Sequence, residues 1–180
     1  MRKVMKMPKR HIILGKTELS KDKFIPIKNR IGFVKPEGGL WASPYTPNKE
    51  YISAWHEWCV GEDFSSGLSN NAVIIDFKED IKFFVIDSQE DLMELFNIVG
   101  EAQDELTSII SSVWKVPNFE IAADIFDVIY LTEEGQWKTR MPFKNHEYSL
   151  YGWDCESILI MNFDCIEKWE YKKLNIVKED

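Results

Sequence analysis

Two carboxylates that precede an apolar run are the residues of this sequence with the clearest chemical potential. Asp154 and Glu156 lie in the segment 150–166, LYGWDCESILIMNFDCI, whose apolar residues 158–161 are typical of a buried strand. Residues i and i+2 of a strand point to the same face, so we expect both carboxylates side by side where the strand begins. Adjacent like charges at the edge of a core disfavour ionisation, which indicates a site or a nearby cation. The alternative is a solvated pair at the end of a strand.

Length and composition predict one domain, 1–180, with a basic N-terminal arm at 1–9. The chain has 180 residues, of which 44% are hydrophobic, and its apolar runs do not exceed five residues. This excludes a membrane-spanning helix, and the basic start lacks the apolar region of a signal peptide. The three cysteines have no CxxC spacing, which argues against a disulfide framework. We therefore expect a cytoplasmic protein that has no membrane partner.

The charge of the chain is unevenly distributed. The net charge is −8, yet residues 1–36 contain eleven Lys or Arg and only two acidic residues. An acidic body with a basic N-terminal segment disfavours nucleic-acid binding by the whole surface and suggests that an anionic ligand meets the N-terminal third. A solvated basic edge is the alternative interpretation.

The hydrophobic pattern predicts an α+β fold. Apolar runs and alternation predict strands, in order, at 10–14, 40–43, 72–77, 82–86, 126–131, 158–161 and 166–174. Helical spacing and capping residues predict helices at 51–60, 87–100, 101–113 and 120–125. The third and fourth strands are expected to form a hairpin because only a short polar turn separates them. We expect irregular structure at 17–39 and a long connection or loose hairpin at 132–148.

Several common catalytic motifs are absent. The sequence contains no Walker loop, GxGxxG, GxSxG or HExxH motif, and its three histidines lack metal-ligand spacing. No metal site is therefore predicted.

Three segments occur in an order that resembles the ADP-ribosyltransferase fold. They are a short strand that ends at Gly15, the segment GGLWAS at 38–43 with an aromatic helix after it, and the strand that begins in WDCESILIMN. In that family the first strand holds NAD through a His-Gly or Arg motif, the second core strand precedes a helix, and the catalytic Glu begins a later strand. Leu14 stands here where the family carries the His. The resemblance implies a single domain with a split, mostly antiparallel β core and a few helices.

The resemblance implies roles for four residues of the second and later strands. Glu156 matches the catalytic Glu, which stabilises the oxocarbenium-like ribose as nicotinamide leaves. Asp154 matches the first acid of the ExE variant, which orients or deprotonates the acceptor. Trp41 would stack on the nicotinamide, as the family's Tyr does. Ser43 is similar to the serine of the family's STS motif.

The remaining cofactor residues implied by the resemblance belong to the basic N-terminal third. Gly15 would allow the backbone to approach the carboxamide. Lys16 and Arg10, together with Lys35, would meet the diphosphate. His11 or Arg10 could supply the contact that the missing His would otherwise make.

These residues support the hypothesis of an NAD-consuming ADP-ribosyltransferase of bacterial or phage type. Such a glycosyltransferase uses NAD as a substrate and transfers ADP-ribose to a macromolecular acceptor, either protein or nucleic acid. One alternative is a non-catalytic member of the same fold that binds a nucleotide or a protein. The other is a small α+β interaction module whose exposed aromatic residues form a protein interface, namely Trp55, Trp58, Trp137 and Trp153.

Overall fold

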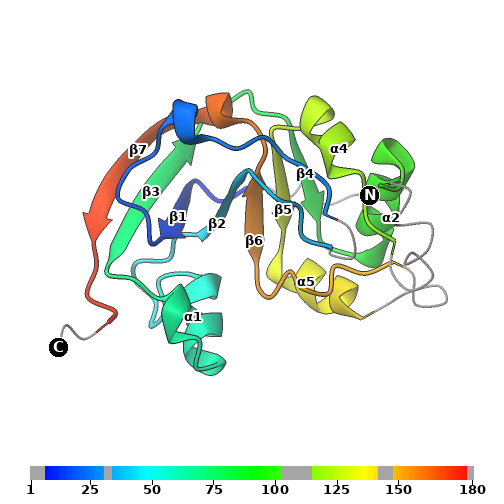
Figure 1. The fold of residues 1–180 in the computed structure, drawn as a ribbon. Coiled ribbons are helices and arrows are strands. Elements are labelled where there is room, and N and C mark those ends of the chain that lie inside the picture. Colours follow the sequence, from blue (N-terminus) through cyan, green and yellow to red (C-terminus); the bar gives the residue numbers. More distant parts are fainter. Residues whose placement is uncertain (1–6, 31–33, 103–114, 142–147, 178–180) are drawn as a thin grey trace.

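The computed structural model describes residues 7–30, 34–102, 115–141 and 148–177 (Figure 1). Its strands are β1 (Arg10–Leu14), β2 (Leu40–Pro44), β3 (Asn71–Phe77), β4 (Phe83–Ile86), β5 (Val128–Leu131), β6 (Ser157–Ile160) and β7 (Ile166–Lys173). They form one seven-stranded sheet in the order β4-β5-β6-β2-β1-β3-β7. Only the β4–β5 pair is parallel. The described part of the chain is therefore an α+β protein with a mostly antiparallel sheet, as the sequence predicts.

Strand β2 joins the two halves of this sheet. Its residues Leu40, Trp41 and Ala42 pair with β6, whereas Ser43 and Pro44 pair with β1. The strand thus changes partners along its length. The split core that the sequence analysis expects is not observed, because this one strand pairs on both sides and keeps the sheet continuous.

The predicted hairpin of the third and fourth strands is wrong. Strand β3 lies between β1 and β7, while β4 lies at the opposite edge of the sheet and pairs only with β5. After β3 the backbone N–H of Lys78 donates to the carbonyl of Cys165 at 3.0 Å, which directs the chain away from a tight turn. Strand β4 instead enters a β–α–β crossover, the connection that a parallel pair requires.

Both faces of the central strands β5 and β6 are buried, which explains why these strands are apolar without alternation. Ile129 and Leu131 of β5 pack on one face with β4, α2 and α4. Val128 and Tyr130 of the same strand pack on the other face. The face that carries Ile129 is covered by α2 and α4, so a site on this side must lie where these two helices leave the sheet uncovered.

Three helices agree with the sequence prediction to within a few residues. They are α1 (Ala54–Gly61), α2 (Gln89–Val99) and α4 (Phe119–Ile125). Helix α1 begins three residues later than expected because Ser53 is its N-cap and accepts a hydrogen bond from the backbone N–H of His56 at 3.1 Å. The predicted helix 101–113 lies almost entirely outside the described residues.

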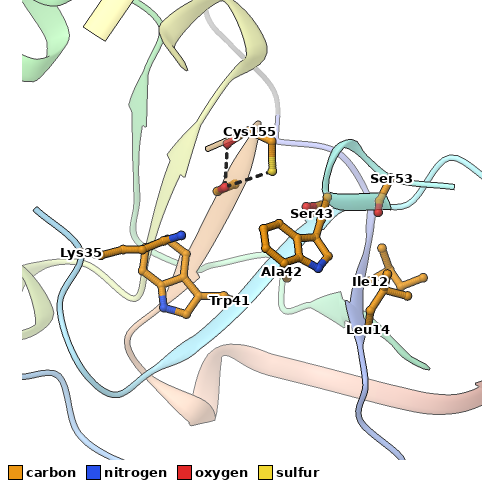
Figure 2. A pocket seen from close by; sticks show the side chains of 10 residues that line it. Ile12, Leu14, Lys35, Trp41, Ala42, Ser43, Ser53 and Cys155 are labelled. Atoms are coloured by element: carbon orange, nitrogen blue, oxygen red, sulfur yellow. Dashed lines mark hydrogen bonds between the residues drawn. The ribbon is translucent and has the colours of Figure 1, made fainter. Parts of the chain in front are cut away.

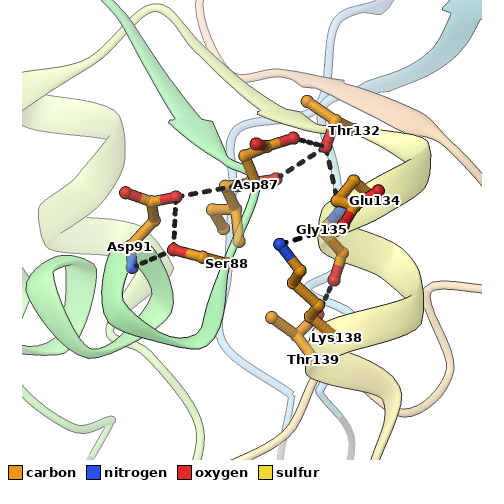
Figure 3. Close-up of polar contacts among 9 residues, drawn as sticks. Asp87, Ser88, Asp91, Thr132, Glu134, Gly135, Lys138 and Thr139 are labelled. Atoms are coloured by element: carbon orange, nitrogen blue, oxygen red, sulfur yellow. Dashed lines mark hydrogen bonds and ion pairs between the residues drawn. The ribbon is translucent and has the colours of Figure 1, made fainter. Parts of the chain in front are cut away.

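Helix α5 (Glu133–Arg140) occupies a segment for which the sequence predicts a long connection or loose hairpin. Its N-cap is Thr132, whose hydroxyl accepts from the backbone N–H of Gly135 at 2.9 Å and donates to Asp87 at 2.5 Å (Figure 3). Asp87 directly follows β4, so this contact ties the start of α5 to the end of that strand. The prediction failed because this helix has few apolar residues, which leaves only its capping residue and the charged residues of its first and last turns as local signals.

The long connection between β1 and β2 is irregular, as expected, but its end packs closely against β6. Its 3₁₀ turn Lys21–Lys23 and an isolated bridge between Lys28 and Glu37 are its only described regular features. Gly38 and Gly39 both have positive φ, and a Cβ on Gly39 would lie 2.6 Å from the carbonyl oxygen of Ile160. The paired glycines therefore let this connection enter β2 directly beside β6.

Candidate functional site

Two adjoining pockets lie beside the end of the sheet where β2 stops and β6 begins. Helices α1 and α5 flank this end of the sheet (Figure 1). The first pocket, here named the tryptophan pocket, has a volume of about 370 Å³ and contains side chains from β1, β2, α1 and the start of β6. The second, here named the acidic pocket, has a volume of about 600 Å³ and lies between α1 and α5. Ser53 and Cys155 line both, so the two pockets share a wall.

The tryptophan pocket is mostly apolar. Ile12 and Leu14 of β1 line it together with Trp41 and Ser43 of β2 (Figure 2). Trp55 of α1 also lines it. These residues meet because alternate positions of the neighbouring strands β1 and β2 point to the same face. A flat aromatic or heterocyclic group is the type of ligand that such a lining accommodates.

The acidic pocket contains five carboxylates and a few aromatic side chains. Its acidic residues are Glu50, Glu57, Glu133, Asp154 and Glu156, and its basic residue among the described lining is Lys49. Trp58 of α1 lines it and stacks on Trp55 of the tryptophan pocket with a 5.0 Å separation between ring centroids. The stacked pair therefore forms an aromatic surface that runs from one pocket to the other.

Glu156 is the carboxylate with the most unusual surroundings. It accepts a hydrogen bond from the hydroxyl of Tyr130, a residue of β5 whose ring is buried in the core. Burial raises the pKa of Glu156, the Tyr130 hydrogen bond opposes this rise, Glu133 adds to it and Lys49 lowers it. Within the described part of the chain, no Lys or Arg lies within 4.0 Å of Glu156. Its charge is therefore available to a positive group of a ligand.

Asp154 is in a different electrostatic position. Its carboxylate lies 3.3 Å from Nζ of Lys35, whose ammonium also lies 5.0 Å from the centroid of the Trp41 ring. Asp154 and Glu156 both line the acidic pocket, but they lie in the turn before β6, which begins only at Ser157. The expectation that they share a strand face is therefore wrong, because both precede the strand. Lys35 pairs with Asp154, and burial, not Asp154, is the largest cause that raises the pKa of Glu156.

Trp41 and Ser43 both line the tryptophan pocket, as the sequence analysis requires of cofactor-binding residues. Trp41 packs edge-on against the buried Trp153 at 4.7 Å, so its ring is held in place by the core. The Ser43 hydroxyl donates to the carbonyl oxygen of Glu156 at 3.2 Å. Ser43 therefore fixes the main chain of Glu156 as well as facing the pocket.

The predicted residues of the first strand lie outside both pockets. Arg10 forms ion pairs with Asp76 of β3 and Glu170 of β7. Gly15 has a φ of 80° and donates its N–H to Asn71, and Lys16 is exposed. Leu14 and Ile12 occupy the pocket wall instead. The structure therefore does not place Arg10, Gly15 or Lys16 against a ligand in either pocket.

His11 also lies outside both pockets because it points into the core, where it contacts Phe77 at 4.7 Å. Its side chain is fully buried and neither ring nitrogen has a hydrogen-bond partner. Burial lowers the pKa of His11 to about 4, and the charge of Asp76 only partly opposes this. His11 is thus a structural residue that the fold keeps neutral.

Replacement of His11 by Leu is expected to make folding less sensitive to acid. The unfolded chain binds a proton at His11 near pH 6.5, whereas the folded chain binds it only near pH 4. The free energy of unfolding therefore falls as the pH decreases from 6.5 to 4, by up to about 3 kcal/mol from this group alone. Urea unfolding of both proteins between pH 7 and pH 4 measures the difference. Equal losses of stability in the two proteins would contradict a neutral, buried His11.

The remaining site features were not foreseen from the sequence. Tyr130 sits in an apolar strand, and only the pairing of β5 with β6 brings it beside Glu156. Cys155 faces both pockets, yet burial raises its thiol pKa to about 11, which removes it as a nucleophile at neutral pH. Of the four aromatic residues proposed for a protein interface, Trp153 is buried and only Trp137 is largely exposed.

Neither a metal centre nor a membrane span is found in the part of the chain that the structure describes. No group of three or more His, Cys, Asp or Glu residues there could hold a metal ion. No helix of these residues is both long and apolar enough to cross a bilayer.

Comparison of the chain with known proteins gave no match to a family model, a curated protein or a solved structure.

Proposed function

We propose that this protein cleaves the nicotinamide–ribose bond of NAD and transfers ADP-ribose to a macromolecular acceptor. The observation that carries the proposal is the position of Glu156, a half-buried carboxylate without a cationic partner among the described residues, beside an apolar aromatic pocket. Bond cleavage leaves positive charge on the ribose, and a preorganised carboxylate in a site of low polarity stabilises that charge.

The arrangement of the strands supports the resemblance to ADP-ribosyltransferases. The three segments that carry the resemblance are far apart in the sequence, yet β6, β2 and β1 are neighbours in the sheet. Helix α1 follows β2, and Glu156 directly precedes β6. The sheet brings these segments together although more than a hundred residues separate β2 from β6.

The pockets suggest how NAD would be placed. The nicotinamide would enter the tryptophan pocket, with its ribose at the shared wall near Glu156. When the C1′–N bond breaks, its electron pair remains on nicotinamide and the positive charge moves to the ribose. The acceptor nucleophile would then approach C1′ from the acidic pocket and give up its proton to Asp154. Lys35 and Lys49, one in each pocket, are the basic residues available to the diphosphate.

A non-catalytic, nucleotide-binding role is the second candidate function. The observation that favours it is Leu14, an apolar residue in the pocket wall where the family carries a His that holds NAD. Without that side chain, the first strand offers no polar side-chain contact to a cofactor in either pocket.

Titration calorimetry with NAD and measurement of released nicotinamide separate these two candidates. Binding with steady release of nicotinamide is the result expected of an enzyme. Binding without release would favour the nucleotide-binding role. Absence of both would contradict the proposed function.

A further inference from the structure

The hydroxyl of Tyr130 is the described side-chain group that donates a hydrogen bond to the carboxylate of Glu156. Tyr130 lies on β5 opposite Ile158 of β6, so its ring is fixed by two neighbouring strands of the sheet. The side chain is 5% exposed and packs in the core with Val128 and Ile158. A hydroxyl held this rigidly can keep one carboxylate oxygen in a single orientation, which leaves the other oxygen for a ligand.

We propose that Tyr130 is a positioning residue that holds Glu156 in its ionised, ribose-facing orientation. This inference rests on the proposed function, because the orientation matters only if Glu156 meets a developing positive charge. Tyr130 would act through Glu156, since it lines neither pocket.

The surroundings of Glu156 explain why such a donor is needed. Glu133 of α5 lines the same pocket, and its negative charge raises the pKa of Glu156 in addition to burial. Lys49 is the one described basic residue of that lining. A hydrogen bond to the charged form therefore partly offsets both burial and like-charge repulsion.

The Tyr130 hydroxyl itself remains protonated at neutral pH. Burial is the largest cause that raises its pKa, and the hydrogen bond to Glu156 raises it further. Tyr130 is therefore a permanent donor and does not compete with Glu156 for a negative charge.

The test measures nicotinamide release by Tyr130→Phe and by wild type over a series of pH values. Loss of the donor should shift the acid limb of kcat/KM to higher pH by roughly one to two units, because a hydrogen bond to a charged group has that strength. We expect kcat at neutral pH to fall about tenfold or more while KM changes little. An unchanged acid limb and kcat would overturn the inference.

Tyr171→Phe is the matched control because Tyr171 lies on the edge strand β7 and its hydroxyl donates to Asn71 of β3 at 2.8 Å. Neither residue lines either pocket. This variant should retain the wild-type pH profile. Direct titration of Glu156 by carboxyl-carbon NMR, with Glu156→Gln to assign the signal, measures the same shift without NAD. If wild type releases no nicotinamide, the proposed function fails. A Glu156 pKa that is equal in wild type and Tyr130→Phe would separately contradict the positioning role.

Discussion

Replacement of Glu156 by Gln is expected to reduce nicotinamide release from NAD by at least about 100-fold. The amide keeps the size of the side chain and can still accept the Tyr130 hydrogen bond, but it carries no charge to oppose the positive ribose. Burial disfavours the ionised form of Glu156, so the loss of this negative charge should leave the thermal midpoint of unfolding unchanged or slightly higher. Nicotinamide release by chromatography and the melting temperature of the same sample give both results.

Glu134→Gln is the matched control for this substitution. This substitution makes the same carboxylate-to-amide change on α5. Glu134, however, pairs with Lys138 at 3.0 Å and lines neither pocket. Its turnover should equal that of wild type. Normal turnover by Glu156→Gln would remove the basis of the proposed mechanism.

Replacement of Gly135 by Ala is expected to lower the free energy of unfolding by about 3 kcal/mol. A Cβ at this position would lie 2.0 Å from the carbonyl oxygen of Ile86 and 2.8 Å from its carbonyl carbon. These are backbone atoms of β4, so α5 would have to move away from the sheet. Since Glu133 and Gln136 of α5 line the acidic pocket, we expect turnover to fall as well.

Gly61 provides the comparison that isolates this packing effect. It is the last residue of α1, and a Cβ there would meet no atom within 4 Å. Gly61→Ala should therefore stabilise the protein by up to about 1 kcal/mol through helix propensity. Urea unfolding of the two variants should give changes of opposite sign. Equal stability of Gly135→Ala and wild type would mean that α5 does not pack closely on β4.

Gly135 also shows why part of the fold was not predictable from local patterns. Local patterns predict a long connection or loose hairpin at 132–148, whereas Gly135 lies in a helix and allows its close contact with the end of a strand. Helix α2 was predictable because Leu92, Leu95 and Phe96 recur at helical spacing and Ser88 caps it. Helix α5 lacks that spacing, and its buried side chains include the polar Gln136 and Thr139.

The candidate site, like the fold, was predictable only where local sequence patterns define its residues. Glu156 and its position before an apolar strand could be inferred locally. The contact with Tyr130 could not, because it depends on the pairing of β5 with β6. His11 illustrates the opposite error, since a residue chosen for its chemistry points into the core on the face away from the pockets. The sequence does not reveal which face of β1 the ligand would meet.

A crystal structure of the Glu156→Gln protein with NAD tests the central claim most directly. The substitution should preserve binding while preventing cleavage, so intact NAD can be observed. We predict the nicotinamide in the tryptophan pocket and the C1′ atom of its ribose about 3.5 Å from the side chain of residue 156. NAD bound away from both pockets, or with its nicotinamide ribose remote from residue 156, would contradict the assignment of this site.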